Sequence, residues 1–378
     1  MDCADNLLTD RIIEPGGTAM GKVLGKLLIG LMLTIGGDIV CAGPYEDAVA
    51  AYNGGDYATA LRLLRPLAEN GNAAAQNNLG VLYLNGQGFP KDYSEAIRWF
   101  RLAAAQKNAW AQTNLGAMYR NGNGVPKDYD EAKKWLTLAV AQGNANAQTE
   151  LGSMYVREEG VPQDYNKAVK LFRLAAAQGN ALAQTDLGWM YQNGFGVPKD
   201  YREAVKMYRL GVAQGNALAQ INLGLMYQNG QKVPPDDKEA VKLFRLAAAQ
   251  GNALAQVILG DVYANGRGVP QDYVRSHMWL SISNDNGNAN AGKSLPLVIS
   301  KMTAAQIELA QKLAKRCKET NYKECDETEG NQTVSIATPL PTNPREGNQS
   351  PPSAMSVPMQ MEGGIYVVPV LINGAIPL

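Results

Sequence analysis

One stretch of the chain has the residues of a phosphate-binding loop. Residues 287–294 read Gly-Asn-Ala-Asn-Ala-Gly-Lys-Ser and match the pattern Gly-x-x-x-x-Gly-Lys-Ser. Such a loop binds phosphate because it joins a buried strand to a helix and directs backbone N–H groups at the anion. Here Gly287 and Asn288 instead align with a Gly-Asn pair that recurs along the chain. We therefore interpret the segment as a degenerate turn between helices, and we predict no bound nucleotide or other cofactor.

Side chains suited to acid–base, nucleophilic or metal chemistry are sparse. His277 is the only histidine, and no cluster of Cys, His and Asp at metal-ligand spacing surrounds it. No serine has a lysine three residues later, and the motif Gly-x-Ser-x-Gly does not occur. We expect His277 to be a packing residue. The sequence thus predicts a protein that is not an enzyme and holds no metal.

Basic residues recur in pairs, and they are the strongest candidates for recognition. If helices stack in register, the pairs align as a ladder, which is interrupted at Thr137 after Lys134. The ladder is either a solvated charged face or a groove that prefers an acidic peptide or glycan. Glutamates three residues before a base can pair along the helix, at Glu95, Glu131, Glu203 and Glu239. The ladder consists of Arg62 and Arg65, Arg98 and Arg101, Lys170 and Arg173, Lys206 and Arg209, and Lys242 and Arg245.

Two tryptophans stand at positions that vary between the repeats of this chain. Trp110 and Trp189 are placed where a repeat protein would put aromatic side chains that contact a partner. Packing between helices is the alternative role. Both remain candidates for partner binding at this point.

The elements that would position these residues follow from a repeat. Between Asp56 and Gln271 the chain repeats itself six times with an unbroken period of 36 residues. A fixed period in this range is typical of a helical solenoid. An Asp-Tyr pair opens the units, except that Asp236 is followed by Asp237. The openings are Asp56, Asp92, Asp128, Asp164, Asp200 and Asp272.

Each unit reads as two short helices. In residues 92–127, Asp92 is placed to cap a first helix, and Ala96, Phe100, Leu102 and Ala103 are expected on its buried face. A second helix carries an apolar stripe formed by Ala111, Leu115 and Tyr119. Two such helices cannot bury their stripes alone, so neighbouring units must stack.

Glycines mark the turns and one position inside the second helix. A Gly-Asn pair ends the first helix in five of the six units, and Lys107 replaces the glycine in the other. Glu158 and Lys232 also stand where glycine is usual, which puts the geometry of those two loops in doubt. Close contact between helices is the expected reason for the helical glycines, which are Gly80, Gly116, Gly152, Gly188, Gly224 and Gly260.

The ends of the solenoid need caps because each unit contacts only its neighbours. Residues 45–53 are predicted to form a lead-in helix. A final helix is predicted from Ala304 to Lys315, with a capping box formed by Thr303 and Gln306. The solenoid with its caps is therefore assigned to residues 45–316.

The motifs Ala-Gln-x-x-Leu-Gly-x-x-Tyr and Gly-x-Gly-Val-Pro resemble those of the Sel-one-like repeat family, which is related to tetratricopeptide repeats. The resemblance implies an all-α fold, a right-handed α/α superhelical solenoid of helix-turn-helix repeats. It also implies an adaptor that binds a protein or peptide on a concave face made by the first helices. Members are often found outside the bacterial cytoplasm or in the lumen of the endoplasmic reticulum.

The balance of charge disfavours some partners. The chain has 35 basic and 35 acidic residues among 378, so no overall field attracts nucleic acid or an anionic membrane. We expect a protein or peptide partner and no nucleic acid. Contact with a membrane is expected only through an uncleaved signal sequence.

Residues 1–42 are interpreted as an N-terminal extension with a signal peptide. Lys22 and Lys26 precede an apolar run, and Val40-Cys41-Ala42 satisfies the small-residue rule for cleavage after Ala42. Met20 is an alternative start, because acidic residues are unusual before such a run. An uncleaved anchor is the other possibility. Cleavage predicts a periplasmic or secreted protein.

Two cysteines lie just past the predicted final helix. Cys317 and Cys325 are eight residues apart in a polar stretch. In an oxidising compartment we expect a small disulfide loop, and otherwise two free thiols.

The C-terminal part changes composition twice. Residues 317–362 become rich in Pro, Ser, Thr and Gln, which is typical of a flexible linker. Residues 363–378 predict a truncated strand pair with a turn at Asn373-Gly374. This last segment resembles the opening hairpin of retropepsin-like aspartic protease domains, but no aspartate follows Asp326, so the catalytic motif is missing. The alternative function is therefore a scaffold portion of such a protease without its catalytic domain.

Overall fold

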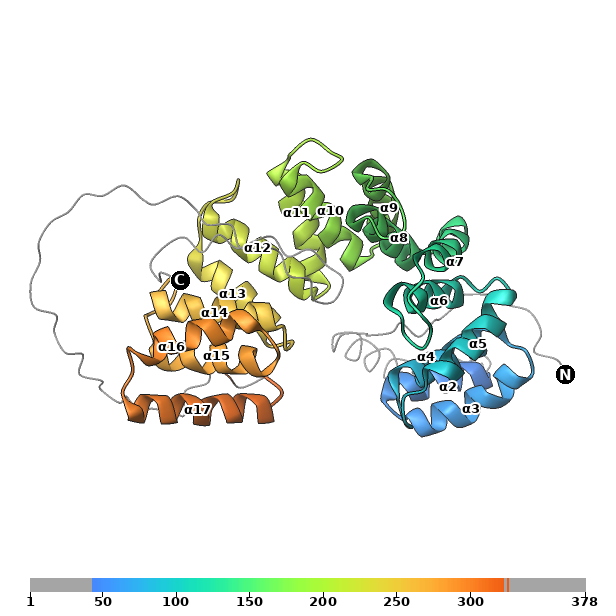
Figure 1. Ribbon diagram of the computed structural model, residues 1–378, viewed down its shortest axis with the longest axis horizontal. Coiled ribbons are helices and arrows are strands. Elements are labelled where there is room, and N and C mark those ends of the chain that lie inside the picture. The colour runs from blue at the N-terminus through green and yellow to red at the C-terminus, as the bar shows by residue number, and fades with distance from the viewer. Residues whose placement is uncertain (1–42, 323–324, 326–378) are drawn as a thin grey trace, which may run out of the picture. The chain divides into compact units, whose positions relative to one another are not determined.

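The computed structural model describes residues 43–322 and Cys325, and in this part of the chain it contains sixteen helices and no strand (Figure 1). The all-α solenoid is confirmed. The predicted signal peptide and strand pair lie outside the described residues. So does the predicted linker (317–362), apart from residues 317–322 and Cys325; residues 317–319 belong to the last turn of α17, so the linker does not begin at 317. Helix α2 (Pro44–Gly54) comes first and α17 (Ala304–Glu319) comes last, close to the predicted bounds of both caps.

The helices between the caps alternate between two kinds. The first kind follows the repeated aspartate, and we call these the Asp-capped helices: α3 (Tyr57–Glu69), α5 (Tyr93–Ala105), α7 (Tyr129–Ala141), α9 (Tyr165–Ala177), α11 (Tyr201–Ala213), α13 (Asp237–Ala248) and α15 (Tyr273–Asp285). The second kind follows the repeated asparagine, and we call these the Asn-capped helices: α4 (Ala73–Asn85), α6 (Ala109–Asn121), α8 (Ala145–Arg157), α10 (Ala181–Asn193), α12 (Ala217–Asn229), α14 (Ala253–Asn265) and α16 (Ala289–Ile299).

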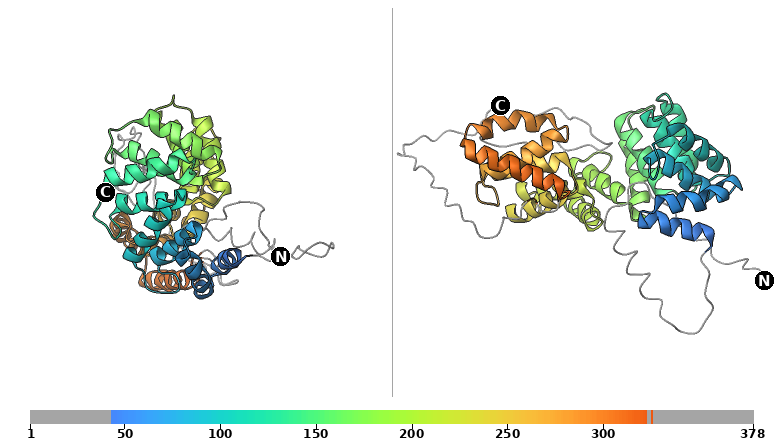
Figure 2. Two further views of the ribbon diagram at one scale, coloured as in Figure 1. Left: turned by 90° about the vertical axis from the view of Figure 1, so that its right-hand side faces the viewer. Right: turned by 90° about the horizontal axis from the view of Figure 1, so that it is seen from below.

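The chain divides into two compact units. The first extends to Asp200 and contains α2 to α10, and the second begins at Tyr201 and contains α11 to α17. Within each unit, helices that follow one another in sequence pack side by side (Figure 2). Each unit is therefore a stack of helical hairpins.

Side-chain caps explain where the helices begin. The Asp92 carboxylate accepts hydrogen bonds from the backbone N–H groups of Ser94 (2.9 Å) and Glu95 (3.1 Å). Asn108 accepts one from the N–H of Ala111 at 2.9 Å. These bonds satisfy N–H groups that have no partner inside the helix. The predicted capping box of Thr303 and Gln306 is also present.

Within the repeats, three non-glycine residues occupy turn positions where the backbone is left-handed. Lys107, Glu158 and Lys232 have φ values of 63°, 58° and 59°. Glycine adopts this conformation without steric cost, whereas in other residues the Cβ makes it unfavourable. The loops at Glu158 and Lys232, whose geometry was in doubt, therefore retain the turn of the other repeats.

The glycines inside the Asn-capped helices allow close approach. A Cβ at Gly80 would lie 2.6 Å from the Phe100 ring, and one at Gly116 would lie 2.6 Å from Leu136. The facing side chain comes from the Asp-capped helix of the next repeat. The predicted close contact is confirmed for Gly80, Gly116, Gly152, Gly224 and Gly260, and it makes these five glycines part of the interface between repeats.

The buried face of α5 was predicted wrongly at one residue. Ala96, Phe100 and Ala103 are buried, but Leu102 is 43% exposed. At about 100° per residue, Leu102 lies roughly 200° around the helix from Phe100, which is the opposite side. The apolar type of the side chain, and not its position on the helix, had suggested burial.

A row of glutamines links successive repeats inside each unit. The Gln76 amide donates to the carbonyl of Ala68 at 3.0 Å and accepts a bond from Gln106 at 2.8 Å. The same side-chain bond joins Gln142 to Gln112 at 2.7 Å. It recurs between Gln178 and Gln148 and, in the second unit, between Gln250 and Gln220. The glutamine of the Ala-Gln motif is thus a buried polar connector between repeats.

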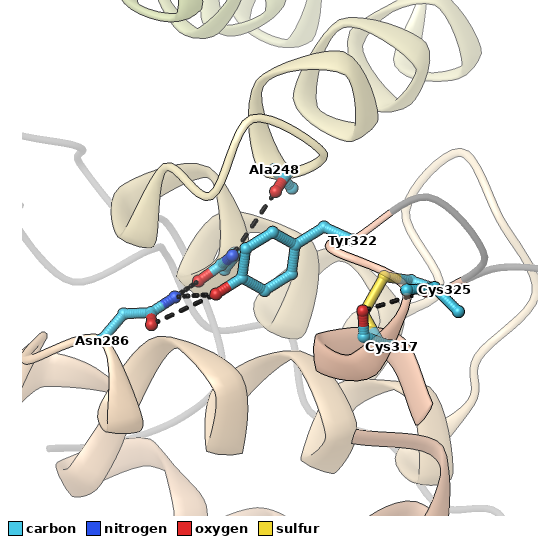
Figure 3. The surroundings of a disulfide bond; sticks show 7 residues. Ala248, Asn286, Cys317, Tyr322 and Cys325 are labelled. Atoms are coloured by element: carbon cyan, nitrogen blue, oxygen red, sulfur yellow. Dashed lines mark hydrogen bonds between the residues drawn. A yellow bond between two sulfur atoms is a disulfide. The ribbon is translucent and has the colours of Figure 1, made fainter. Parts of the chain in front are cut away.

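The C-terminal cap closes this row. Asn286 takes the place of the donor glutamine and bonds to Gln256 at 2.9 Å, and it also bonds to the Tyr322 hydroxyl at 3.2 Å (Figure 3). Tyr322 follows α17 and donates its backbone N–H to the carbonyl of Cys317 at 2.8 Å. A disulfide joins Cys317 to Cys325. The bridge thus closes the short loop that contains Tyr322.

Candidate interaction surfaces

The predicted basic pairs lie on the Asp-capped helices. All of their members are exposed except Arg245, which is partly buried. The first unit contains those of α3, α5 and α9, and the second contains those of α11 and α13. In each unit the pairs occupy the same two positions of successive repeats. We call these the first and second basic positions.

Most side chains at the first basic position pair with the predicted glutamate. Arg98 contacts Glu95 at 2.8 Å, and Lys134 contacts Glu131 at 2.9 Å. Lys206 with Glu203 and Lys242 with Glu239 repeat the arrangement in the second unit, at 3.4 and 2.8 Å. Exposed pairs of this kind contribute only about 0.3–0.5 kcal/mol each to stability. Lys170 differs, because Lys167 stands where these four repeats have glutamate, and Lys170 has no acidic partner among the described residues.

Arginines at the second basic position bind tyrosine hydroxyls within their own repeat. Arg101 donates to Tyr119 at 2.9 Å, and Arg173 donates to Tyr191 at 3.0 Å. The same bond joins Arg65 to Tyr83, Arg209 to Tyr227 and Arg245 to Tyr263. These arginines therefore connect the two helices of a repeat, which the sequence analysis did not foresee. The signal was a basic residue that always precedes a tyrosine by 18 positions.

The interruption at Thr137 has a local replacement. Tyr155 is the tyrosine that an arginine at position 137 would reach. Instead the Lys167 ammonium lies 5.2 Å from the centre of the Tyr155 ring. A cation over an aromatic face is favourable by about 0.5–1 kcal/mol at an exposed site. A base therefore contacts the tyrosine in this repeat too, although it comes from the next Asp-capped helix.

Exposed leucines follow the second basic position directly. In the first unit they are Leu102, Leu138 and Leu174, which are 43%, 45% and 55% exposed. Leu210 and Leu246 hold the same position in the second unit, at 43% and 53%. We call the three leucines of the first unit the leucine row. Each projects from an Asp-capped helix away from that helix's buried face.

A cluster of five charged side chains lies on the Asn-capped helices of the first unit. Arg120 from α6 forms ion pairs with Glu150 from α8 and with Glu159 in the following loop, the latter at 2.6 Å. The Arg120 side chain is only 7% exposed. Arg157 and Asp186 complete the cluster, and Asp186 comes from α10. Burial raises the pKa of Asp186 to about 7, although Arg157 and Arg120 favour its ionised form.

A family model of the Sel1 repeat matches residues 73–108, 111–144, 145–180, 181–216, 217–252 and 253–288. The chain belongs to the Sel1 repeat family. Each match begins near an Asn-capped helix and ends at the Gly-Asn turn after the next Asp-capped helix. The unit of the family is therefore the pair of helices that the helical glycine brings together. Sel1 repeats form a scaffold fold that is typical of protein–protein interaction.

The chain is also similar to solved structures, the first of which supports this assignment. A Sel1 repeat protein from Oxalobacter formigenes is 36% identical over 64% of this chain and 99% of its own, with a TM-score of 0.58. The protective antigen c5321 of uropathogenic Escherichia coli, which displays an SLR fold, is 25% identical over 81% of this chain and 88% of its own, with a TM-score of 0.38. The immunity protein Pa5087 from Pseudomonas aeruginosa is 24% identical over 56% and 87%, with a TM-score of 0.40. No curated protein matches the chain.

The two tryptophans of this Sel1 repeat protein have different surroundings. Trp110 lies at the start of α6 and is partly exposed. Trp189 is 8% exposed, and its ring centre is 5.0 Å from that of Phe195, which in turn stacks on Tyr165 at 4.8 Å. Trp110 therefore keeps surface that a partner could contact, whereas Trp189 contributes mainly to packing. Contact with a partner stays a prediction for both.

The phosphate-loop-like segment and His277 lie in a turn between helices and in the packed core. Gly287, with φ 90°, and Asn288 form the turn between α15 and α16, so a helix and not a strand precedes the Gly-x-x-x-x-Gly-Lys-Ser segment. His277 is buried, with Nδ1 3.3 Å from the Ser281 hydroxyl oxygen, and burial lowers its pKa. In the described residues no three His, Cys, Asp or Glu side chains gather to hold a metal ion. None of the helices described is both long and apolar enough to cross a membrane.

Proposed function

We propose that this Sel1 repeat protein is a non-enzymatic scaffold that binds a protein partner along the Asp-capped helices of its first unit. The observation that supports the proposal is the leucine row. Leu102, Leu138 and Leu174 recur at one repeat position and leave a large part of their apolar surface in water. Exposed apolar side chains in register, flanked by polar ones, are typical of a protein-binding surface.

The charges beside the row indicate the chemistry of the partner. Arg98, Arg101, Lys170 and Arg173 flank the leucines on α5 and α9. Arg98 and the second-position arginines already form an ion pair or hydrogen bonds within the chain, so they are less available to a partner. Lys170 has none in the described residues and lies one helical turn before Leu174. The surface therefore suits a partner segment that carries apolar residues together with acidic ones.

A triple variant tests this surface. Leu102→Ser, Leu138→Ser and Leu174→Ser together remove the apolar row and leave every arginine bonded to its tyrosine. Proteins crosslinked to the full-length chain in its own cells would be compared between the wild type and the variant by mass spectrometry. We expect at least one acidic partner to be lost from the variant.

The control for this experiment is Leu309→Ser, which alters an exposed leucine (43%) on α17 in the other unit. It should retain the wild-type partners. Identical partners for the triple variant and the wild type would contradict the proposal, as would an absence of any partner.

We also propose that the protein acts after export, in the periplasm or outside the cell. The signal features of residues 20–42 support this, and so does the disulfide between Cys317 and Cys325, because disulfides persist in oxidising compartments. Amino-terminal sequencing of protein from the exported fraction should find Gly43 as the first residue. Protein found only inside the cell, with both thiols open to maleimide labelling, would contradict export.

A further inference from the structure

One tyrosine of the first unit lacks the arginine that its counterparts bind. In its repeat Thr137 stands at the second basic position, and neither Thr137 nor Tyr155 forms a side-chain hydrogen bond with the described residues. Both hydroxyl groups can therefore donate to a molecule outside the chain. The counterparts that accept a bond from a second-position arginine are Tyr83, Tyr119, Tyr191, Tyr227 and Tyr263.

The charge beside Tyr155 also departs from the repeat. Four of the other tyrosines are followed, 12 residues later, by a glutamate that pairs with the first basic position. After Tyr155 this place is taken by Lys167, whose ammonium lies 5.2 Å from the centre of the tyrosine ring and 3.3 Å from the Asp164 carboxylate. Lys167 forms no hydrogen bond with the Tyr155 hydroxyl. This repeat therefore has a base where the others have an acid, and its hydroxyl is not bonded.

Lys170 supplies a second cation near this tyrosine. Its counterpart two repeats earlier is Arg98. The hydrogen bond to Glu95 raises the pKa of Arg98, and Tyr83 contributes to the same shift, so Tyr83 lies near the guanidinium. Lys170 and Tyr155 occupy the same two positions of their own repeat. Arg98 is paired with Glu95, whereas Lys170 is exposed and has no acidic partner among the described residues.

We propose that Tyr155 and Lys170 bind the carboxylate of an aspartate or glutamate side chain in the protein partner. A phenolic O–H and an ammonium group are both donors, and a carboxylate accepts several hydrogen bonds. Thr137 directly precedes Leu138, and Lys170 lies one turn before Leu174, so the bound carboxylate would lie beside two members of the leucine row. The inference rests on the proposed function and specifies where the acidic residue of the partner binds.

A pair of peptides tests this carboxylate site. The first is fluorescein-labelled Leu-Glu-Glu-Leu-Leu-Glu-Glu-Leu, and in the second glutamine replaces every glutamate. Fluorescence polarisation is followed as the full-length protein is added at low salt. We expect Tyr155→Phe and Lys170→Gln each to weaken binding of the glutamate peptide about three- to tenfold, the loss expected for one partly exposed hydrogen bond. Neither variant should change binding of the glutamine peptide, because that peptide has no carboxylate side chain.

Two matched variants control for charge and for the loss of a hydroxyl group. Lys312→Gln removes the same charge from the exposed surface of α17 in the second unit and should change binding less than twofold. Tyr119→Phe removes a hydroxyl that already accepts a bond from Arg101, and it should not weaken binding. Equal losses in Lys170→Gln and Lys312→Gln would show that the peptide senses only net charge. That result, or full binding by Tyr155→Phe, would overturn the proposal.

The triple leucine variant separates the carboxylate site from the proposed function. If that variant loses the glutamate peptide while Tyr155→Phe and Lys170→Gln retain it, the leucine row binds and the carboxylate site is wrong. The unaltered protein gives a further test, since it should bind the glutamate peptide more tightly than the glutamine peptide. Equal binding of the two peptides, or no binding of the glutamate peptide, would overturn the carboxylate site. The crosslinked partners would still decide whether the leucine row binds a protein.

Discussion

Gly152 shows how a single residue controls the distance between repeats. A Cβ at this position would lie 2.7 Å from one carbon of the Phe172 ring and 3.0 Å from another. Phe172 is buried on α9 and cannot move into solvent. The same contact recurs between Gly224 and Phe244 in the second unit. Glycine destabilises the helix at this position, but it lets the two helices approach, and a larger side chain would separate them.

We expect Gly152→Ala to lower the free energy of unfolding by about 1–3 kcal/mol, the usual cost of overpacking. In a helix without the contact, alanine would instead be favoured over glycine. Urea unfolding of the full chain measures the change. Gly54→Ala is the control, since a Cβ at Gly54 meets nothing within 4 Å. Equal stability of Gly152→Ala and the wild type would contradict the close-contact explanation.

The raised pKa of Asp186 predicts how the stability of the protein depends on pH. Its pKa in the folded protein is about 7, above the ordinary value of 3.8, because burial disfavours the charged carboxylate. The folded state therefore binds more protons than the unfolded state between these values. The contribution of Asp186 to stability is greatest at low pH and is lost as the pH rises toward 7.

Asp186→Asn should thus gain stability relative to the wild type between pH 5 and pH 8, by about 1–3 kcal/mol. Urea unfolding of both proteins at the two pH values measures this difference. Asp130→Asn should show no such gain, because its carboxylate is exposed on α7. A constant difference between Asp186→Asn and the wild type would show that burial does not control this carboxyl group.

At the scale of the helices, the glutamine row determines how one repeat meets the next. Gln76 is buried, and it connects the carbonyl of Ala68 in its own repeat with Gln106 in the following one. Gln76→Leu would remove both of these bonds, although the Ala68 carbonyl keeps a bond from the backbone N–H of Gly71 at 3.1 Å and the exposed Gln106 amide can bond to water. We expect a loss of about 1–3 kcal/mol, the net contribution of two intramolecular hydrogen bonds.

A double-mutant cycle separates this bond from the packing of the glutamine. Gln106→Ala alone should cost less than Gln76→Leu, because Gln106 is exposed at the end of α5. The two changes should be non-additive, since the second removes a donor whose acceptor is already absent. Additive effects would mean that the bond between the two amides is not significant.

The loops after the Asn-capped helices show a compensation between repeats. Gln87 bonds to the Tyr57 hydroxyl at 3.3 Å, in the previous Asp-capped helix. In α13, Asp237 stands at the position of Tyr57, and Arg267 stands at the position of Gln87 in the loop after α14. Arg267 pairs with Asp237 at 2.9 Å. The departure from the Asp-Tyr opening is therefore matched 30 residues later by a complementary charge.

At the scale of the whole molecule, the stability of a solenoid is the sum of the stabilities of its repeats and of the interfaces between neighbouring repeats. A terminal repeat has a neighbour on one side only, so it needs a cap. The C-terminal end is closed by Tyr322, whose ring also lies 3.2 Å from a Cβ placed on Gly251. Cys317 and Cys325 are buried in the same core cluster as Phe244 and Trp279. The disulfide therefore restrains the loop that covers the last repeats.

We expect Cys317→Ser with Cys325→Ser to lower the free energy of unfolding of the second unit by about 2–3 kcal/mol, the loop-closure value for a bridge of this length. Amide hydrogen exchange should accelerate in α15 to α17 and stay unchanged in α3 to α8, because the effect passes only between neighbouring repeats. Faster exchange throughout the chain would contradict this local role. Unchanged exchange in α17 would show that the bridge is not needed by the cap.

The sequence alone determined the all-α solenoid, the helix starts and the turns, because these depend on local chemistry repeated every 36 residues. Asp92 caps a helix whatever surrounds it, and a helical glycine kept in every repeat indicates a close neighbour. Only the tertiary structure showed that Leu102 is exposed and that second-position arginines such as Arg101 bind tyrosines. It alone brought Arg120, Glu150 and Asp186 together, because they come from three repeats and meet only when those repeats stack. Contacts between repeats depend on the rotation from one repeat to the next, and the period of a sequence does not contain that rotation.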